Sequence, residues 1–190
     1  VPMRQLVVLT LAALITASSE AQTVWKTDKS HSNVKFTVSH LVIAEVSGRF
    51  KDFDATVKTT KDDFSDMQVE ATIKTGSIDT DNEQRDKHLR SDDFLNAEEF
   101  PEMKFKSTGI VKTGENTFNI KGDLTIRDVT KPVVLNAKLG GVIKDPWGNT
   151  KAGFRATTSV DRFEYGVKWN KAIETGGLVA GKVIDTTLLF

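Results

Sequence analysis

The chemically versatile side chains of this chain gather in one stretch, residues 80–101, which reads TDNEQRDKHLRSDDFLNAEEFP. It mixes carboxylates and basic side chains with one histidine, and Asp86 lies two residues before His88. A carboxylate near a histidine is a pairing that general acid–base catalysis uses. One hypothesis is therefore a hydrolase or isomerase acting on a small lipophilic or acidic molecule, with Asp86 and His88 as its residues.

The spacing of these residues fits no catalytic template. Residues 83–90 are good helix formers without a β-branched residue, and positions two apart on a helix point to different sides. The three histidines, His31, His40 and His88, form no i,i+4 pair of the zinc-hydrolase kind, and no G-x-S-x-G occurs. Without cysteine there is no thiolate nucleophile or zinc–thiolate site. The sequence therefore predicts no catalytic residue and no metal site, and the acid–base hypothesis stays as the alternative.

The same stretch also has the start and stop signals of a helix. Thr80 followed by Glu83 is the pattern of a capping box. Ser91 can begin a second short turn, and Pro101 stops any continuation. We therefore expect a short helical insert over about residues 81–96.

We expect this insert to act as a lid or end-plug. Arg85, Asp86 and His88 either hold this lid shut or also meet the polar end of a ligand. The insert is attached to the rest of the domain by its apolar side chains, which are Leu89, Phe94, Leu95 and Phe100.

Outside the insert, apolar and polar residues alternate with period two, which is typical of half-buried strands. Glycine-bearing turns at 112–116 and 145–149 favour antiparallel hairpins, and 46–50 and 138–142 are further breaks. About eight strands predict a mainly β protein, either a sandwich or a closed eight-stranded antiparallel barrel. The segments are 34–38, 52–58, 67–74, 103–107, 118–127, 133–139, 154–160 and 183–190.

A barrel of about eight strands is just wide enough to hold one small ligand, although plain core packing explains the same apolar face. Strand parity and position select the side chains expected to line such a ligand site. They are Phe36, Val38, His40, Phe50, Phe53, Leu89, Phe94, Phe105, Leu124, Ile126, Phe154 and Phe163.

The first residues predict export. Arg4 precedes an apolar run at 6–15, and Ser19 and Ala21 fit a cleavage site, so we expect a signal peptide over 1–21 and one domain over 22–190. The run is shorter than the about 20 residues that span a bilayer, so no stable membrane insertion is expected. The predicted location is the periplasm, with secretion as the alternative. The 26 basic and 26 acidic side chains balance, which does not favour binding to nucleic acid.

Five segments, in the right order, resemble the YceI-like family over essentially all of residues 24–190. One position departs from the family pattern TIRGVT, because Asp128 stands in place of glycine; Asp tolerates positive φ better than most residues, so the turn is expected to hold. The segments are HSNVKFTVSH followed by GRF, SIDTDNEQRDKHLRSDDFLNAEEFPEMKFKST, GDLTIRDVTKPV, DPWGNTKAGFRATTSVDRFEYGVKW and GKVIDTTLLF.

The resemblance implies a lipocalin-like barrel with a helical segment that is exported and binds a polyisoprenoid chain. The leading hypothesis is thus a periplasmic carrier or sequestering protein for a long apolar isoprenoid lipid of the quinone or polyprenyl type. No cofactor is expected beyond such a bound polyisoprenoid or quinone, and the expected partner is a lipophilic small molecule. A homodimer like that of the family, and a structural or stress-response role with an incidental cavity, are left open.

Overall fold

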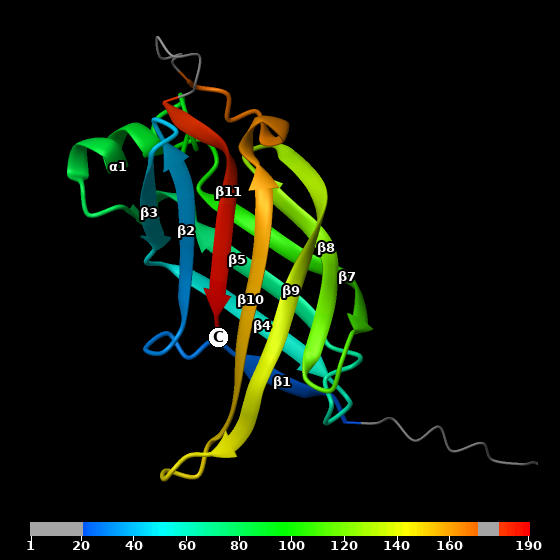
Figure 1. The fold of residues 1–190 in the computed structure, drawn as a ribbon. Helices are drawn as coiled ribbons and strands as arrows, with labels where there is room; N and C mark the ends of the chain where they lie inside the picture. The colour runs from blue at the N-terminus through cyan, green and yellow to red at the C-terminus, as the bar shows by residue number, and fades with distance from the viewer. Residues whose placement is uncertain (1–20, 171–178) are drawn as a thin grey trace, which may run out of the picture.

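The computed structural model describes residues 21–170 and 179–190. These residues form a mainly β protein with one α-helix and two 3₁₀ helices, as predicted (Figure 1). The elements are β1 Thr23–Lys26, β2 Asn33–His40, β3 Ala44–Phe50, β4 Phe53–Thr59, β5 Gln68–Lys74, η1 Thr75–Ser77, β6 Ile78–Asp79, α1 Glu83–Arg90, β7 Glu102–Lys112, β8 Thr117–Ile126, β9 Val129–Lys144, β10 Thr150–Asp161, η2 Arg162–Tyr165 and β11 Ala180–Leu189.

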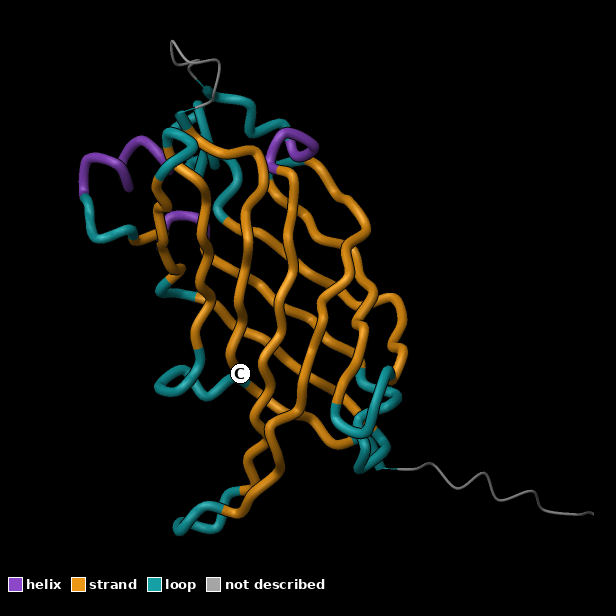
Figure 2. The backbone as a smooth tube through the Cα atoms, in the orientation of Figure 1, coloured by secondary structure: helices purple, strands orange, loops and turns teal. Residues whose placement is uncertain are grey.

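The strands form one curled antiparallel sheet in the order β1-β4-β5-β7-β8-β9-β10-β11-β2-β3-β6 (Figure 2). Although β3 and β4 follow each other in the chain, β3 pairs with β2 and β6, whereas β4 pairs with β1 and β5. Between them, Lys51 N donates to Ser77 O (3.1 Å), and Lys74 N donates to Asp52 O (2.9 Å). These bonds link the β3–β4 connection to the end of β5 and to η1, so the sheet curls back on itself, which is consistent with a lipocalin-like barrel.

The predicted count of eight strands is wrong, because the sheet in the described residues has eleven. Two of the additional strands, β1 and β6, have only four and two residues and carry little periodic signal. The third, β3, includes the segment 46–50 that the sequence marks as a break. Gly48 stands inside this strand because a Cβ there would overlap the Phe36 ring and the Thr80 methyl group.

The other expected break, 138–142, also lies within a strand. β9 continues through it to Lys144, with Gly141 at φ +151°. Its pairing with β10 shifts register between Gly153 and Phe154, so the glycines absorb a bulge rather than end the strand. The turns expected at 112–116 and 145–149 do separate strands, β7 from β8 and β9 from β10.

Along several strands, the inward-facing side chains are more buried at one end of the strand than at the other. On β8, Phe118 and Ile120 are buried, whereas Leu124 and Ile126 are half-buried. The same change occurs on two neighbouring strands, from Val34 to Phe36 and Val38 on β2, and from Leu188 to Thr186 and Ile184 on β11. The sheet therefore has a packed end near β1, called the closed end below, and a less filled end near α1 and η2, called the open end (Figure 1).

Aromatic rings fill the closed end. Phe64 lies 5.5 Å from Trp25 and 5.1 Å from Phe154, measured between ring centroids, and Phe118 lies 6.4 Å from Phe154. Phe64 and Phe118 are almost fully buried. Rings at these separations and tilts pack favourably, so these side chains form a dense core at this end.

The helical insert lies in the predicted stretch of about 81–96, but its α-helix spans only Glu83–Arg90 and has a different cap. The N-cap is Asn82, whose Oδ1 accepts a hydrogen bond from Arg85 N (2.9 Å), so the predicted Thr80–Glu83 capping box is wrong. The Thr80 hydroxyl donates instead to Asp86 Oδ1 (2.5 Å), which also accepts from Thr80 N (2.9 Å). The buried Asp86 carboxylate thus takes the group that a capping box would use.

Two further predictions concern the N-terminal segment and the membrane. The predicted signal peptide, 1–21, lies outside the described residues except for Ala21. Across residues 21–170 and 179–190, no helix has the length and apolar character needed to traverse a bilayer.

Candidate ligand-binding cavity

A cavity of about 630 Å³ occupies the interior of the open end. This volume lies within the range of about 300–1,000 Å³ that is usual for small-molecule sites. Its wall is mostly apolar and comes from every strand of the described sheet except β1 and β4. The apolar lining residues include Val34, Phe36, Val38, Phe50, Val69, Ile73, Met103, Phe105, Leu124, Ile126, Leu135, Val160, Ile184, Leu188 and Phe190.

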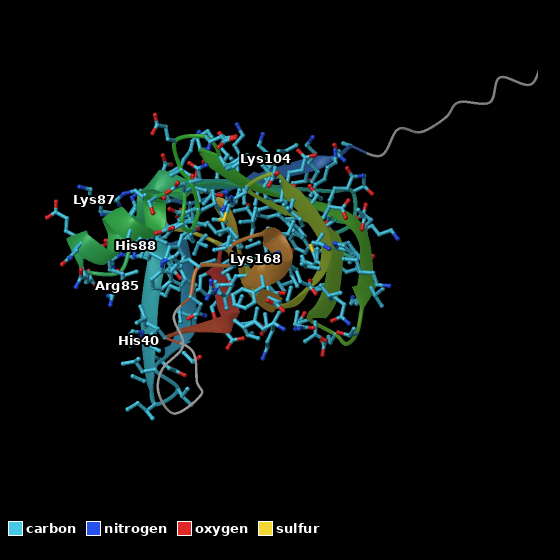
Figure 3. All side chains as sticks on the ribbon, turned by 90° about the horizontal axis from the view of Figure 1, so that it is seen from above. His40, Arg85, Lys87, His88, Lys104 and Lys168 are labelled. Atoms are coloured by element: carbon cyan, nitrogen blue, oxygen red, sulfur yellow. The ribbon has the colours of Figure 1, made fainter. Side chains whose placement is uncertain are left out.

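Some of the polar lining residues lie where the cavity reaches the surface, whereas Thr158 and Thr186 lie within β10 and β11. Asn82 and Gln84, next to and on α1, are exposed and also line the cavity, so the cavity opens beside this helix. In Figure 3, seen from above, α1 lies at the side of the open end, with His40, Arg85 and His88 labelled there. The insert therefore forms part of the rim, and its Leu89, Phe94 and Leu95 side chains line the cavity.

Nine of the twelve residues predicted to line a ligand site do line this cavity, and Phe53, Phe154 and Phe163 do not. Phe53 and Phe154 point inward, as their parity predicts, but they pack in the hydrophobic core. Phe163 lies on η2, where the Arg162 guanidinium stacks 4.7 Å from its ring centroid. Alternation predicted the face of each strand, but it does not encode depth along the barrel.

Two of the three predicted lid residues, Arg85 and Asp86, share Thr80 as a partner, whereas His88 contacts Asp93. Arg85 donates from Nε to Thr80 Oγ1 (2.8 Å) and from Nη2 to Thr80 O (2.7 Å), so both Arg85 and Asp86 fasten the link from β6 to α1. His88 Nε2 lies 2.8 Å from Asp93 Oδ2. Arg85 and His88 line the cavity and Asp86 does not. The structure therefore pairs His88 with Asp93 and does not assemble Asp86 and His88 as an acid–base pair.

An aromatic cluster at the rim was not predicted from the sequence. The His88 ring meets the Phe94 and Trp169 rings edge-on, with centroids 5.0 and 4.9 Å apart, and Phe94 lies 5.1 Å from Trp169. Trp169 follows the 3₁₀ helix η2, where the strand alternation has ended, so periodicity gave no sign of its position. The cluster joins the insert to the segment after η2.

Arg127 also fastens the insert. In the turn between β8 and β9 the residue with positive φ is Arg127 (+56°), and not Asp128, for which the sequence analysis had invoked tolerance of that conformation. Arg127 Nη1 donates to Phe94 O (3.2 Å), and its guanidinium lies 5.5 Å from the Phe100 ring centroid.

A buried cation, Arg162, completes the wall at the open end. Arg162 is 4% exposed, and its side chain donates to four backbone oxygens of the described residues: Gly181 (2.8 Å), Val167 (2.7 Å), Trp169 (3.0 Å) and Ala180 (3.1 Å). Burial lowers the pKa of the Arg162 guanidinium, but arginine stays protonated in proteins. A permanent positive charge therefore lines the cavity.

A second hollow, of about 640 Å³, has a lining of both polar and apolar residues and shares Val133, Thr158 and Val160 with the first cavity. It is lined by residues of β8, β9, β10 and η2, among them Lys121, Lys131, Asn136, Asp161 and Glu164. Within residues 21–170 and 179–190, no three histidine or acidic side chains come together as a metal site.

The curled sheet and its inner apolar cavity define a lipocalin-like architecture. The chain belongs to the YceI-like family, since the model of the YceI-like domain matches residues 25–188. A UPF0312 protein of Shewanella denitrificans is 43% identical over 155 residues, covering 82% of this chain and 81% of the relative.

Solved structures share the fold. The YCEI protein of Campylobacter jejuni is 32% identical, with a TM-score of 0.69 over 86% of this chain and 94% of the other. A polyisoprenoid binding domain from Saccharophagus degradans, implicated in plant cell wall breakdown, is 12% identical, with a TM-score of 0.58 over 90% of this chain and 97% of that domain. At that identity the second likeness concerns the fold.

Proposed function

We propose that this protein binds a long isoprenoid lipid, of the quinone or polyprenyl type, in the cavity of the open end and serves as a periplasmic carrier or sequestering protein. The observation that carries the proposal is the cavity itself: an apolar interior that opens at one end beside polar side chains. A polyisoprenoid binding domain with the same fold supports this ligand class. The signal-peptide pattern supports export.

The energetics favour a long tail over a small polar ligand. Burying one five-carbon isoprene unit is worth roughly 3–4 kcal/mol at about 0.8 kcal/mol per CH₂. Ordering of the chain and loss of free motion offset much of this gain. A few buried units are still enough for firm binding, and polar groups are needed only to position the head.

Binding without chemistry is the second part of the proposal. His88 is hydrogen-bonded to Asp93, while the Asp86 carboxylate accepts from Thr80. These contacts give both carboxylates structural roles. We therefore assign the insert to the rim of a binding site rather than to a catalytic centre.

The test is native mass spectrometry of the protein purified from the periplasm, followed by extraction and identification of any bound lipid. We expect a bound species whose mass matches an isoprenoid. Leu124→Trp, which places a larger side chain in the cavity, should lose that species, whereas Val134→Trp, at an exposed position of β9 that does not line the cavity, should retain it. Reproducible absence of lipid from the wild-type protein would contradict the proposal.

A further inference from the structure

The ionisable side chains that line the cavity are all basic in type. His40, Arg85, His88 and Arg162 line it, and among the described residues no aspartate or glutamate does. Acidic and basic side chains are equally frequent in the chain as a whole. The ionisable groups of the cavity lining are thus all basic, although the chain as a whole is balanced.

These basic groups lie at one end of the cavity. His40 ends β2, Arg85 and His88 lie on α1, and Arg162 begins η2, all at the open end. The deep wall is apolar, with Leu135 and Leu188 among its buried residues. A ligand that matches this layout has an apolar tail and one polar end with a fixed direction.

Two of these groups are permanent cations with neutral hydrogen-bond partners. Arg162 donates to four backbone carbonyls, and Arg85 donates to the hydroxyl and carbonyl of Thr80. The carboxylate next to Arg162, Asp161, is paired with Lys182 Nζ (2.9 Å).

A charge taken out of water without a counter-ion is costly, and its attraction for an opposite charge grows as the surroundings become less polar. The nearest carboxylates are Asp161, beside Arg162, and Asp86, which accepts from the same Thr80 hydroxyl that Arg85 contacts. Neither carboxylate lines the cavity, so a neutral head group would bring no negative charge to the cavity side of the two guanidinium groups.

We propose that the bound isoprenoid carries an anionic head group, a phosphate ester, held at the open end by Arg85 and Arg162 with its tail toward Leu188. Guanidinium groups bind phosphate oxygens with charge-assisted, geometrically matched hydrogen bonds. This inference rests on the proposed function and narrows it from quinone or polyprenyl lipids to prenyl phosphates.

The experiment compares probes that share one tail: geranylgeranyl phosphate, geranylgeraniol and a naphthoquinone with a geranylgeranyl substituent. Each is titrated against a bound fluorescent prenyl probe. We expect the phosphate to displace the probe at a concentration at least tenfold below that of the alcohol, which equals about 1.4 kcal/mol. Inorganic phosphate alone, which lacks a tail, should leave the probe bound.

Variants locate the effect. Arg85→Gln should reduce the preference for phosphate over alcohol several-fold, while Lys87→Gln, an exposed neighbour on the same helix, should keep it. Because Arg162 also ties backbone segments together, Arg162→Lys accompanies Arg162→Gln. The lysine variant should retain more of the preference.

The outcomes separate the two proposals. If the wild-type protein binds the alcohol or the quinone as tightly as the phosphate, the anionic head group is wrong and isoprenoid binding stands. If Arg85→Gln and Arg162→Gln both keep the full preference for the phosphate, the assignment of these two side chains is overturned. If none of the probes binds, the proposed function itself fails.

Discussion

The closed and open ends of the sheet are built by the same strands, yet their interiors differ. Along β8, Phe118 and Ile120 meet other side chains on every side, whereas Leu124 and Ile126 face the cavity. Strands β2 and β11 change in the same direction. Side chains packed against each other at one end stabilise the fold, and side chains left without such neighbours at the other end provide a binding surface. Substitutions at the two ends should therefore separate stability from binding.

The largest expected effect is at the closed end. Phe118 is 1% exposed, and Phe118→Ala should lower the free energy of unfolding by about 3–5 kcal/mol, because it leaves a void among rings that cannot collapse around it. Urea denaturation measures the change. Lipid affinity of the folded variant should stay near that of the wild type, and a loss below about 1 kcal/mol would contradict the dense packing of this end.

A smaller loss is expected where the closed end gives way to the open end. A Cβ at Gly122 would overlap the Phe105 ring and the Lys106 carbonyl oxygen, so Gly122→Ala should cost about 1–3 kcal/mol of stability. Gly109 on β7 is the matched control, because no atom lies near the position of its Cβ. Gly109→Ala should leave stability unchanged or raise it by up to about 1 kcal/mol. Equal losses at both glycines would refute the role of this contact.

At the open end the same chemical change should act on binding more than on stability. Phe36 is half-buried and packs on Phe50, with ring centroids 5.6 Å apart, but its inner side faces the cavity. Phe36→Ala should therefore lower stability by only about 1–2 kcal/mol, below the usual range for a buried ring. Its affinity for an isoprenoid should fall about tenfold, measured by probe displacement. A stability loss as large as that of Phe118→Ala would break the contrast between the two ends.

The smallest expected effect is electrostatic and lies on the loop that carries Phe64. Hydrogen bonds from Thr59 and Thr60 hold the pKa of Asp66 well below its usual range. A depressed pKa in the folded state stabilises the protein above the unfolded pKa of about 3.9, and this contribution is lost as pH falls toward the folded pKa. Asp66→Asn should thus reduce stability at neutral pH, and the difference should shrink in acid.

Urea denaturation near neutral pH and at about pH 3 tests this, with Asp62→Asn, at an exposed position of the same loop, as control. A difference between Asp66→Asn and wild type that is equal at both pH values would contradict the assignment.

Local sequence patterns predicted much of the fold, but they did not predict how deep in the barrel each side chain lies. Alternation located the longer strands and their inward faces, and helix formers located α1 at 83–90. The short strands β1 and β6 carry too few residues for a period, and Gly48 looked like a break because its role is a contact with Phe36 on the neighbouring strand.

The candidate site was likewise predicted in part by local patterns and determined in part by tertiary contacts. Phe36, Val38 and Leu124 line the cavity as parity predicts, whereas Phe154 has the same parity and lies at the closed end. Trp169 and Arg162 sit beyond the last alternating residue of β10, where tertiary contacts alone place them. The ligand class came from the family resemblance and not from periodicity.

The most direct test of the central claim, that the open end holds an isoprenoid tail, is a crystal structure of the protein with geranylgeranyl phosphate bound. The account predicts continuous density for the tail inside the sheet, from Leu135 and Leu188 up to the level of His88, with the head group at the open end. An interior filled by inward-turned side chains, or a lipid bound only in the hollow lined by Lys121 and Glu164, would contradict it.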